Sequence, residues 1–182
     1  SGDIPIGGLG DEGFFIGSKF DVELDINVHG LGVFHPYGTG FRRDGDETSD
    51  FFTGNNLDAE VRLFSETGEL IASAVVEAGP GLCTYSSESD PTASEYSYEA
   101  ISAVTLSAGS TYYLIMKTGP GVFIMYDNDS PGLGFDSNVF SNVSTRNIST
   151  NGADFDSYNP ATAGDNQWSD FYFSCNMLFT PF

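Results

Sequence analysis

Apolar and polar positions alternate most clearly in residues 57–76, where the pattern predicts two strands and the turn between them. Ala59, Val61 and Leu63 occupy every second position, a short polar segment follows, and an apolar run rich in β-branched residues then resumes. Gly68 lies in the polar segment and can adopt the positive φ that a short hairpin turn with a bulge requires. We therefore expect a β-hairpin whose register decides which side chains face the core.

Further strands are predicted on both sides of this hairpin, each a short apolar alternation bounded by turn-forming residues. They are residues 14–22, 26–34, 100–106, 111–118, 122–127 and 170–177. Two glycines in the second of these indicate a bulge or a closely packed neighbour. We expect the third and fourth to pair with each other and the fifth to pair on from them. The pattern predicts an all-β fold, an antiparallel two-sheet β-sandwich of the jelly-roll kind with about eight strands.

Three long polar segments, residues 36–56, 77–98 and 128–168, interrupt the strands. Segments of this length in a compact domain are usually functional or disordered. The chain of 182 residues fits a single domain, and we expect residues 1–182 to form one sandwich with these segments as long loops.

The charge is strongly acidic, with 26 Asp and Glu against 6 Lys and Arg and a formal net charge of −20. Such a field repels phosphate backbones and anionic membrane surfaces, so we expect no nucleic-acid partner and no membrane insertion. Cations are the natural partners, and Ca²⁺ is the cofactor that we expect. The alternative is that the acidity only keeps the protein soluble in a salty or calcium-rich medium outside the cell.

Two sets of carboxylates are candidate calcium ligands, because calcium takes six to eight oxygen ligands from loops of this kind. The first set is Asp44, Asp46 and Asp50. The second set is Asp127, Asp129, Asp154, Asp156 and Asp165. The alternatives are a solvated acidic loop for the first set and ordinary turn formation for the second.

A sugar ligand needs flat aromatic faces beside hydrogen-bonding side chains. Trp168 is the only tryptophan, and amides and further aromatics occur near it or in other loops. The candidate ligand-binding residues are Trp168, Tyr126, Tyr158, Tyr37, Asn166 and Gln167. The alternative is that Trp168 only caps the core.

The two cysteines, Cys83 and Cys175, allow a disulfide that would tie the segment 77–98 to the last strand. The alternative is a pair of buried thiols. No nucleophile, zinc or phosphate-loop motif accompanies the two histidines, so we expect no enzyme. A glycoside hydrolase would need a spaced carboxylate pair that the sequence does not single out.

Four segments give the chain a family resemblance: IGSKFDVELDINVHGLGVF at 16–34, EVRLFSETGELIASAVV at 60–76, AVTLSAGSTYYLIM at 103–116 and WSDFYF at 168–173. In these it resembles bacterial extracellular β-sandwich modules grouped as a domain of unknown function. The resemblance covers the framework strands, roughly half of the chain, and it carries no catalytic residues. It implies a secreted or cell-surface module of a larger multidomain protein, beside carbohydrate-active or adhesion domains.

We therefore expect a module that binds a glycan or another cell-surface ligand, assisted by calcium. The alternative is a structural spacer that presents neighbouring domains and has no ligand of its own.

Overall fold

The structure is a computed structural model. It describes residues 7–8, 14–35, 59–76, 95–117, 123–124, 126–127, 136–149, 154–163, 171–172 and 175–182. The elements in these ranges are β1 (Gly7–Gly8), β2 (Phe14–Val22), β3 (Ile26–His35), β4 (Ala59–Ser65), β5 (Leu70–Val76), β6 (Glu95–Leu106), β7 (Thr111–Lys117), β8 (Phe123–Ile124), β9 (Tyr126–Asp127), β10 (Phe140–Ser149), the 3-10 helix η1 (Phe155–Ser157), β11 (Phe171–Tyr172) and β12 (Cys175–Pro181).

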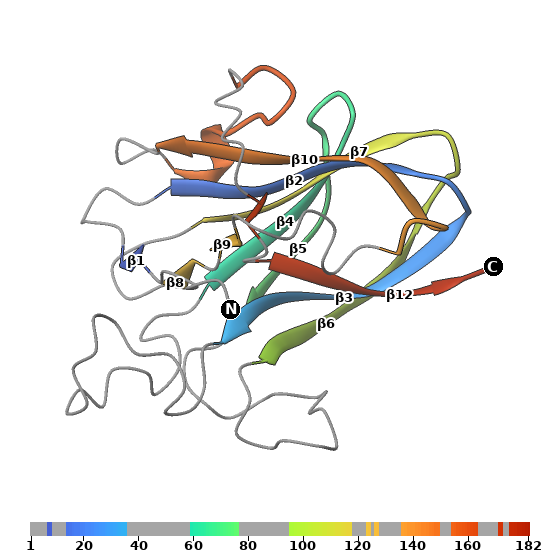
Figure 1. The fold of residues 1–182 in the computed structure, drawn as a ribbon, viewed down its shortest axis with the longest axis horizontal. Coiled ribbons are helices and arrows are strands. Elements are labelled where there is room, and N and C mark those ends of the chain that lie inside the picture. Colours follow the sequence, from blue (N-terminus) through green and yellow to red (C-terminus); the bar gives the residue numbers. More distant parts are fainter. Residues whose placement is uncertain are drawn as a thin grey trace.

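Two antiparallel sheets face each other and form the predicted β-sandwich (Figure 1). The larger sheet has the order β10-β2-β7-β4-β5, and the smaller has the order β12-β3-β6, eight strands in all. The all-β prediction is therefore confirmed. In the described ranges, no helix has the length and apolar character needed to cross a membrane.

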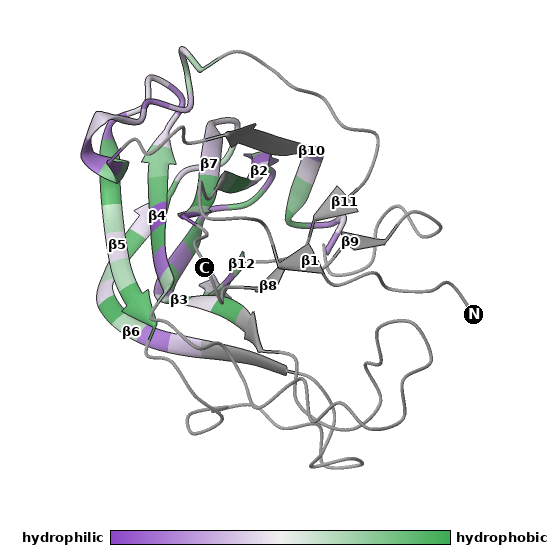
Figure 2. Cartoon of the chain, turned by 90° about the vertical axis from the view of Figure 1, so that its left-hand side faces the viewer, coloured by the Kyte–Doolittle hydropathy of each residue, from purple (hydrophilic) through white to green (hydrophobic). Residues whose placement is uncertain are grey.

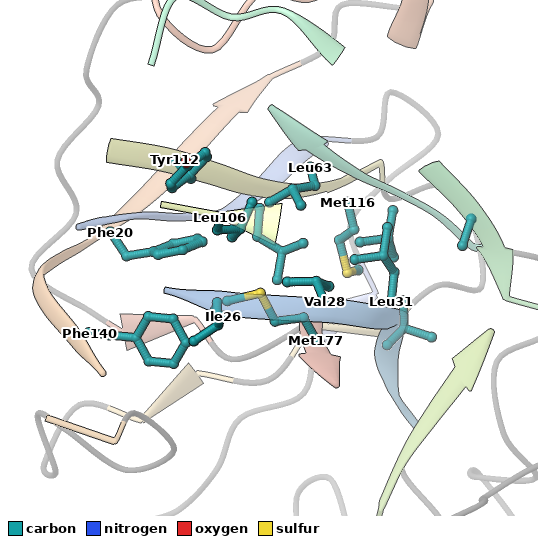
Figure 3. Packing of buried hydrophobic residues seen from close by; sticks show 14 of the residues in the cluster. Phe20, Ile26, Val28, Leu31, Leu63, Leu106, Tyr112, Met116, Phe140 and Met177 are labelled. Carbon is teal, nitrogen blue, oxygen red and sulfur yellow. The ribbon is translucent and has the colours of Figure 1, made fainter. Parts of the chain in front are cut away.

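The core lies between the two sheets, because each principal strand turns its apolar parity inward. In β4 the side chains of Ala59, Val61 and Leu63 are all buried, as the alternation predicts. Figure 3 shows Leu63 and Met116 of the larger sheet packing towards residues of the smaller one. Side chains that are 0% exposed, such as Leu63 and Met116, mark the centre of this core.

The hairpin of β4 and β5 and the glycine-containing strand β3 follow the predictions. Gly68 has a φ of 82°, and the backbone N–H of Gly68 donates to the carbonyl oxygen of Ser65 at 2.9 Å. In β3 the register shifts between Val28 and Gly30, and a Cβ placed on Gly30 would meet Leu178 Cδ1 at 3.2 Å. Both expected uses of a glycine in this strand, a bulge and a close neighbour, are therefore present.

Strand pairing differs from the prediction in the second half of the chain. The expected pair β6 and β7 is wrong: β6 pairs with β3, whereas β7 pairs with β2 and β4 in the other sheet. The turn between them crosses from sheet to sheet, and Gly109 N–H in it donates to Val22 O at the end of β2 at 2.7 Å. β8 and β9 likewise pair with β1 and β11 rather than with β7. Local alternation shows that a strand has one buried face but does not choose its neighbour.

Two of the predicted loops contain strand residues. β6 begins at Glu95, inside the segment 77–98, and β10 spans ten residues of the segment 128–168. β10 lies at the edge of the larger sheet, and among the described strands it pairs with β2. Its sequence, FSNVSTRNIS, is mostly polar and has no apolar alternation, so the pattern did not mark it as a strand.

Candidate functional site

Most of the predicted site residues lie outside the described residues. They are Trp168, Tyr37, Asn166, Gln167, Asp44, Asp46, Asp50, Asp129, Asp165 and Cys83. The backbone of Tyr126 and Asp127 is described in β9, which pairs with β11 in the register Tyr126 to Tyr172 and Asp127 to Phe171. β9 therefore lies beside β11, the strand that comes directly after the predicted ligand residues 165–168 in the sequence.

Three predicted site residues with described side chains, Asp154, Asp156 and Tyr158, belong to one segment, residues 154–163, which we call the strap. The strap covers the outer face of the larger sheet, opposite the main core. Under it lies a second apolar cluster, formed by outward-facing positions of β2, β4 and β7 and by the strap itself. The members are Phe15, Phe64, Tyr113, Ile115 and Phe155, with Tyr158 packed against them.

Aromatic rings carry the contact between the strap and the sheet. Phe155 is 0% exposed, and its ring centroid lies 5.1 Å from that of Phe15. The ring of Tyr158 stacks on Phe15 at 4.2 Å and meets Phe64 edge-on at 6.4 Å. The half-buried Tyr158 ring therefore packs against the scaffold, which is a different use from the sugar platform predicted for it.

Arg62 of β4 is the polar anchor of the strap. Its guanidinium donates from Nε to Glu60 Oε1 at 2.7 Å and from Nη2 to Asp156 Oδ1 at 2.6 Å, and its Cζ lies 4.4 Å from the centre of the Phe155 ring. Burial acts to lower the pKa of Arg62, but the hydrogen bonds to Glu60 and Asp156 outweigh it, so the pKa is raised. The side chain is 12% exposed, and its charge is met by two carboxylates and one aromatic face.

The ion pair bears on the calcium prediction for Asp156, because one carboxylate oxygen of Asp156 already accepts from a cation. Asp154 is exposed, and its backbone carbonyl oxygen accepts from Ser157 Oγ at 2.7 Å. In the described ranges, no group of three or more His, Cys, Asp or Glu side chains is arranged to hold a metal ion. The calcium site stays a prediction for both sets of carboxylates.

A third anchor, which the sequence pattern did not indicate, joins the strap to the β4–β5 turn. A Cβ placed on Gly68 would collide with the side-chain amide of Asn159. Asn159 Oδ1 in turn accepts from the backbone N–H of Ala161 at 2.8 Å. Gly68 thus serves both the turn, through its positive φ, and the close approach of the strap.

Carboxylates near the turns after β2 and β6 hold turns and strand edges together. Asp21 accepts from Thr111 Oγ1 at 2.6 Å and from Asn142 Nδ2 at 2.7 Å, and these hydrogen bonds lower the pKa of Asp21. Asn142 has a φ of 48° at the register shift of β10. Asp25 accepts from the backbone N–H of Ala108 at 2.7 Å. Part of the acidity therefore serves local structure.

Cys175 is a free thiol, so the structure does not contain the predicted bridge to Cys83. The residue is half-buried, but its sulfur points between the sheets, with Sγ 3.5 Å from Leu114 O and 3.9 Å from Ile16 O. Burial raises the pKa of the thiol to about 12. This position agrees with a buried thiol, the alternative that the sequence left open for Cys175, and the sulfur acts as a small buried group between the sheets.

The register shows where the long connections begin and end. Ala59 pairs with Val76, and Lys117 pairs with both Phe15 and Glu60, so these strand ends are level in the larger sheet. In the smaller sheet the start of β6 pairs with the end of β3, and the start of β12 also pairs near that end. The short turns after β2, β4 and β6 all lie at the other end of these strands.

As a result, the connections from β3 to β4, from β5 to β6 and from β7 onward all leave or enter the sandwich at one end, which we call the loop end. It lies toward the left of Figure 1, whereas the C-terminus lies at the right. The predicted ligands Tyr37, Asp44, Asp46 and Asp50 fall in the connection from β3 to β4, which leaves and enters the sandwich at the loop end. No family model matches the chain, and no curated protein or solved structure is significantly similar to it.

Proposed function

We propose that this chain is an extracellular or cell-surface binding module that uses its loop end to hold a glycan or another surface ligand, with calcium ordering the loops. The observation that carries the proposal is the attachment of the long connections to one end of a well-packed sandwich. Binding residues commonly lie on loops that a rigid scaffold positions. The resemblance to bacterial extracellular modules points to the same setting.

The composition of these connections supports a polar ligand. Residues 36–58 contain Tyr37 together with Asp44, Asp46 and Asp50, and the last connection contains Trp168. Aromatic faces beside carboxylates and amides are the groups that recognise sugar rings, and carboxylates on loops are calcium ligands.

A spacer without its own ligand is the second candidate, and the strap favours it. Tyr158 and Asp156, both predicted to bind ligands, contact Phe15 and Arg62 of the sheet and so attach the strap to it. If the other predicted residues were used in the same way, the module would only present its neighbours.

The first experiment is a thermal melt with calcium and with a chelator, followed by a glycan array in the better condition. A ligand that binds only the folded state raises the melting temperature, so calcium should raise it by several degrees. Trp168→Ala should abolish glycan binding while leaving the melting temperature unchanged. Tyr158→Ala is the matched control, because it should lower the melting temperature and leave binding intact in the folded fraction.

No calcium shift together with no glycan signal would reject the binding proposal and leave the spacer. A glycan signal that survives Trp168→Ala would reject the assignment of the site to the loop end.

A further inference from the structure

β5 forms an open edge of the larger sheet. It is hydrogen-bonded to β4 on one side, and no strand in the described ranges pairs with its other side. Its sequence, LIASAVV, contains no charged residue, no proline and no glycine. Leu70 and Val75 are each 51% exposed. Figure 2 shows β5 at the border of the sheet, coloured in pale to deep green along most of its length.

The other three edges of the sandwich carry features that discourage strand addition. β10 is bulged at Asn142, and β6 carries the charged residues Glu95 and Glu99. β12 has a register shift and ends at Pro181. Charges, bulges and prolines are the usual means by which proteins block exposed edges. β5 has a register shift only at its start, so Ala72–Val76 is a regular strand, and no strand of the described ranges is hydrogen-bonded to its outer side.

The order of residues in β5 indicates which strand fits there. Leu-Ile-Ala-Ser-Ala-Val-Val is nearly symmetric about Ser73, with small residues at the centre and large apolar residues at both ends. We propose that β5 pairs antiparallel with β5 of a second copy of this chain, about a two-fold axis at Ser73. The pairing joins two five-stranded sheets into one continuous sheet, through the self-complementary interface that two-fold symmetry requires.

This register gives the exposed apolar side chains a partner. Opposite residues on antiparallel strands point to the same face, so Ala72 lies opposite Ala74 of the second copy. Val75 of one copy lies opposite Ile71 of the other, and Leu70 lies opposite Val76. Each of the two exposed residues, Leu70 and Val75, thereby gains an apolar residue opposite it.

Charge opposes the association at long range and so predicts its salt dependence. Each copy has a net charge of −20, so two copies repel each other. β5 itself is uncharged, so added salt screens the repulsion without weakening the contact. The dimer is therefore expected to tighten as the salt concentration rises, unlike an association held by ion pairs.

Analytical ultracentrifugation of the chain, from about 1 to 200 µM and at about 50 mM and 1 M salt, tests the proposal. We expect a monomer–dimer equilibrium that shifts to dimer in high salt. Ser73→Lys places two like charges at the axis and should weaken the dimer at least about tenfold. Thr180→Lys adds the same charge to an exposed position of the edge strand β12 and should leave the dimer unchanged.

A second pair of variants separates local from overall charge. Glu69→Lys should tighten the dimer, because it removes a negative charge directly before β5 and adds a positive one there. Glu66→Lys makes the same charge change in the β4–β5 turn, outside the strand, and should have a smaller effect. Circular dichroism verifies that each variant is folded. Amide hydrogen exchange of the unaltered chain should be slowed in β5 at high protein concentration, which tests the interface without any substitution.

A monomer at every concentration and salt, or a dimer that Ser73→Lys does not weaken, would overturn the proposal. So would a chain that stays monomeric while an added extended peptide protects the β5 amides, because the edge would then accept a foreign strand.

Discussion

Replacing Phe155 by alanine tests whether the strap is held mainly by apolar packing. The ring is 0% exposed and lies between the sheet and the rest of the strap, 5.1 Å from the Phe15 ring and 6.2 Å from the Phe64 ring. A buried aromatic side chain removes about 150–250 Å² from water, which corresponds to about 4–6 kcal/mol at 25 cal/mol per Å². A compact unfolded chain already buries some of this area, so about 3–5 kcal/mol is the expected loss.

The strap can also detach locally, and this limits the effect on global unfolding. Its other anchors are the Arg62–Asp156 pair, in which Asp156 is 78% exposed, and the contact of Asn159 with Gly68. An exposed ion pair contributes about 0–1 kcal/mol, too little to hold the strap alone. We therefore expect Phe155→Ala to lower the free energy of unfolding by about 2–4 kcal/mol and to raise amide exchange in residues 154–163.

The assay combines urea denaturation with hydrogen exchange read by mass spectrometry. Phe182→Ala is the matched control, because Phe182 is 78% exposed and its removal should change stability by less than about 0.5 kcal/mol. A loss below about 1 kcal/mol for Phe155→Ala, together with unchanged exchange in the strap, would refute the packing argument.

Four further outcomes are expected. Gly17→Ala should destabilise the fold severely or prevent folding, since its Cβ would collide with Leu114 O. Gly109→Ala, at φ 77° with open space around the Cβ, should lower the free energy of unfolding by only about 1 kcal/mol, as thermal melts can measure. Arg62→Lys should raise amide exchange in the strap more than Asp156→Asn does. Lysine loses both the hydrogen bonds of the guanidinium to two carboxylates and its stacking on Phe155. Equal effects of the two substitutions would contradict this. Because the pKa of Asp21 is lowered in the folded chain, its ionised carboxylate adds to the free energy of unfolding above the ordinary aspartate pKa, and this contribution is lost as pH falls through the lowered value. In an acid titration, the free energy of unfolding of Asp21→Asn should therefore fall less steeply than that of the unaltered chain. Burial raises the pKa of Cys175 to about 12, so the thiol should resist alkylation at pH 8 until denaturant is added. Site-resolved mass spectrometry measures this. Rapid labelling of the native chain would contradict the burial of the sulfur.

The sequence alone determined most of the framework strands and which side chains they bury. Alternation located β2, β3, β4 and β5. It placed residues 170–177 in one strand, whereas the structure has two strands there, β11 and β12, in different sheets. It also identified Gly68 as a turn residue and a glycine in β3 as a bulge. These features could be predicted because they depend on residues close together in the chain, through backbone dihedrals and the two-residue period of a strand.

Only the tertiary structure decided how the strands pair and what covers the outer face of the larger sheet. The edge strand β10 escaped prediction because its mostly polar sequence has no apolar alternation. Phe155 and Arg62 lie far apart in the chain, and no local pattern indicates that they stack. Tyr158 and Asp156 have the chemistry of ligand-binding residues, and only the tertiary structure shows that they also contact Phe15 and Arg62. Such contacts form only where packing free energy between distant segments exceeds the entropy of ordering them, a balance that no single stretch of sequence contains.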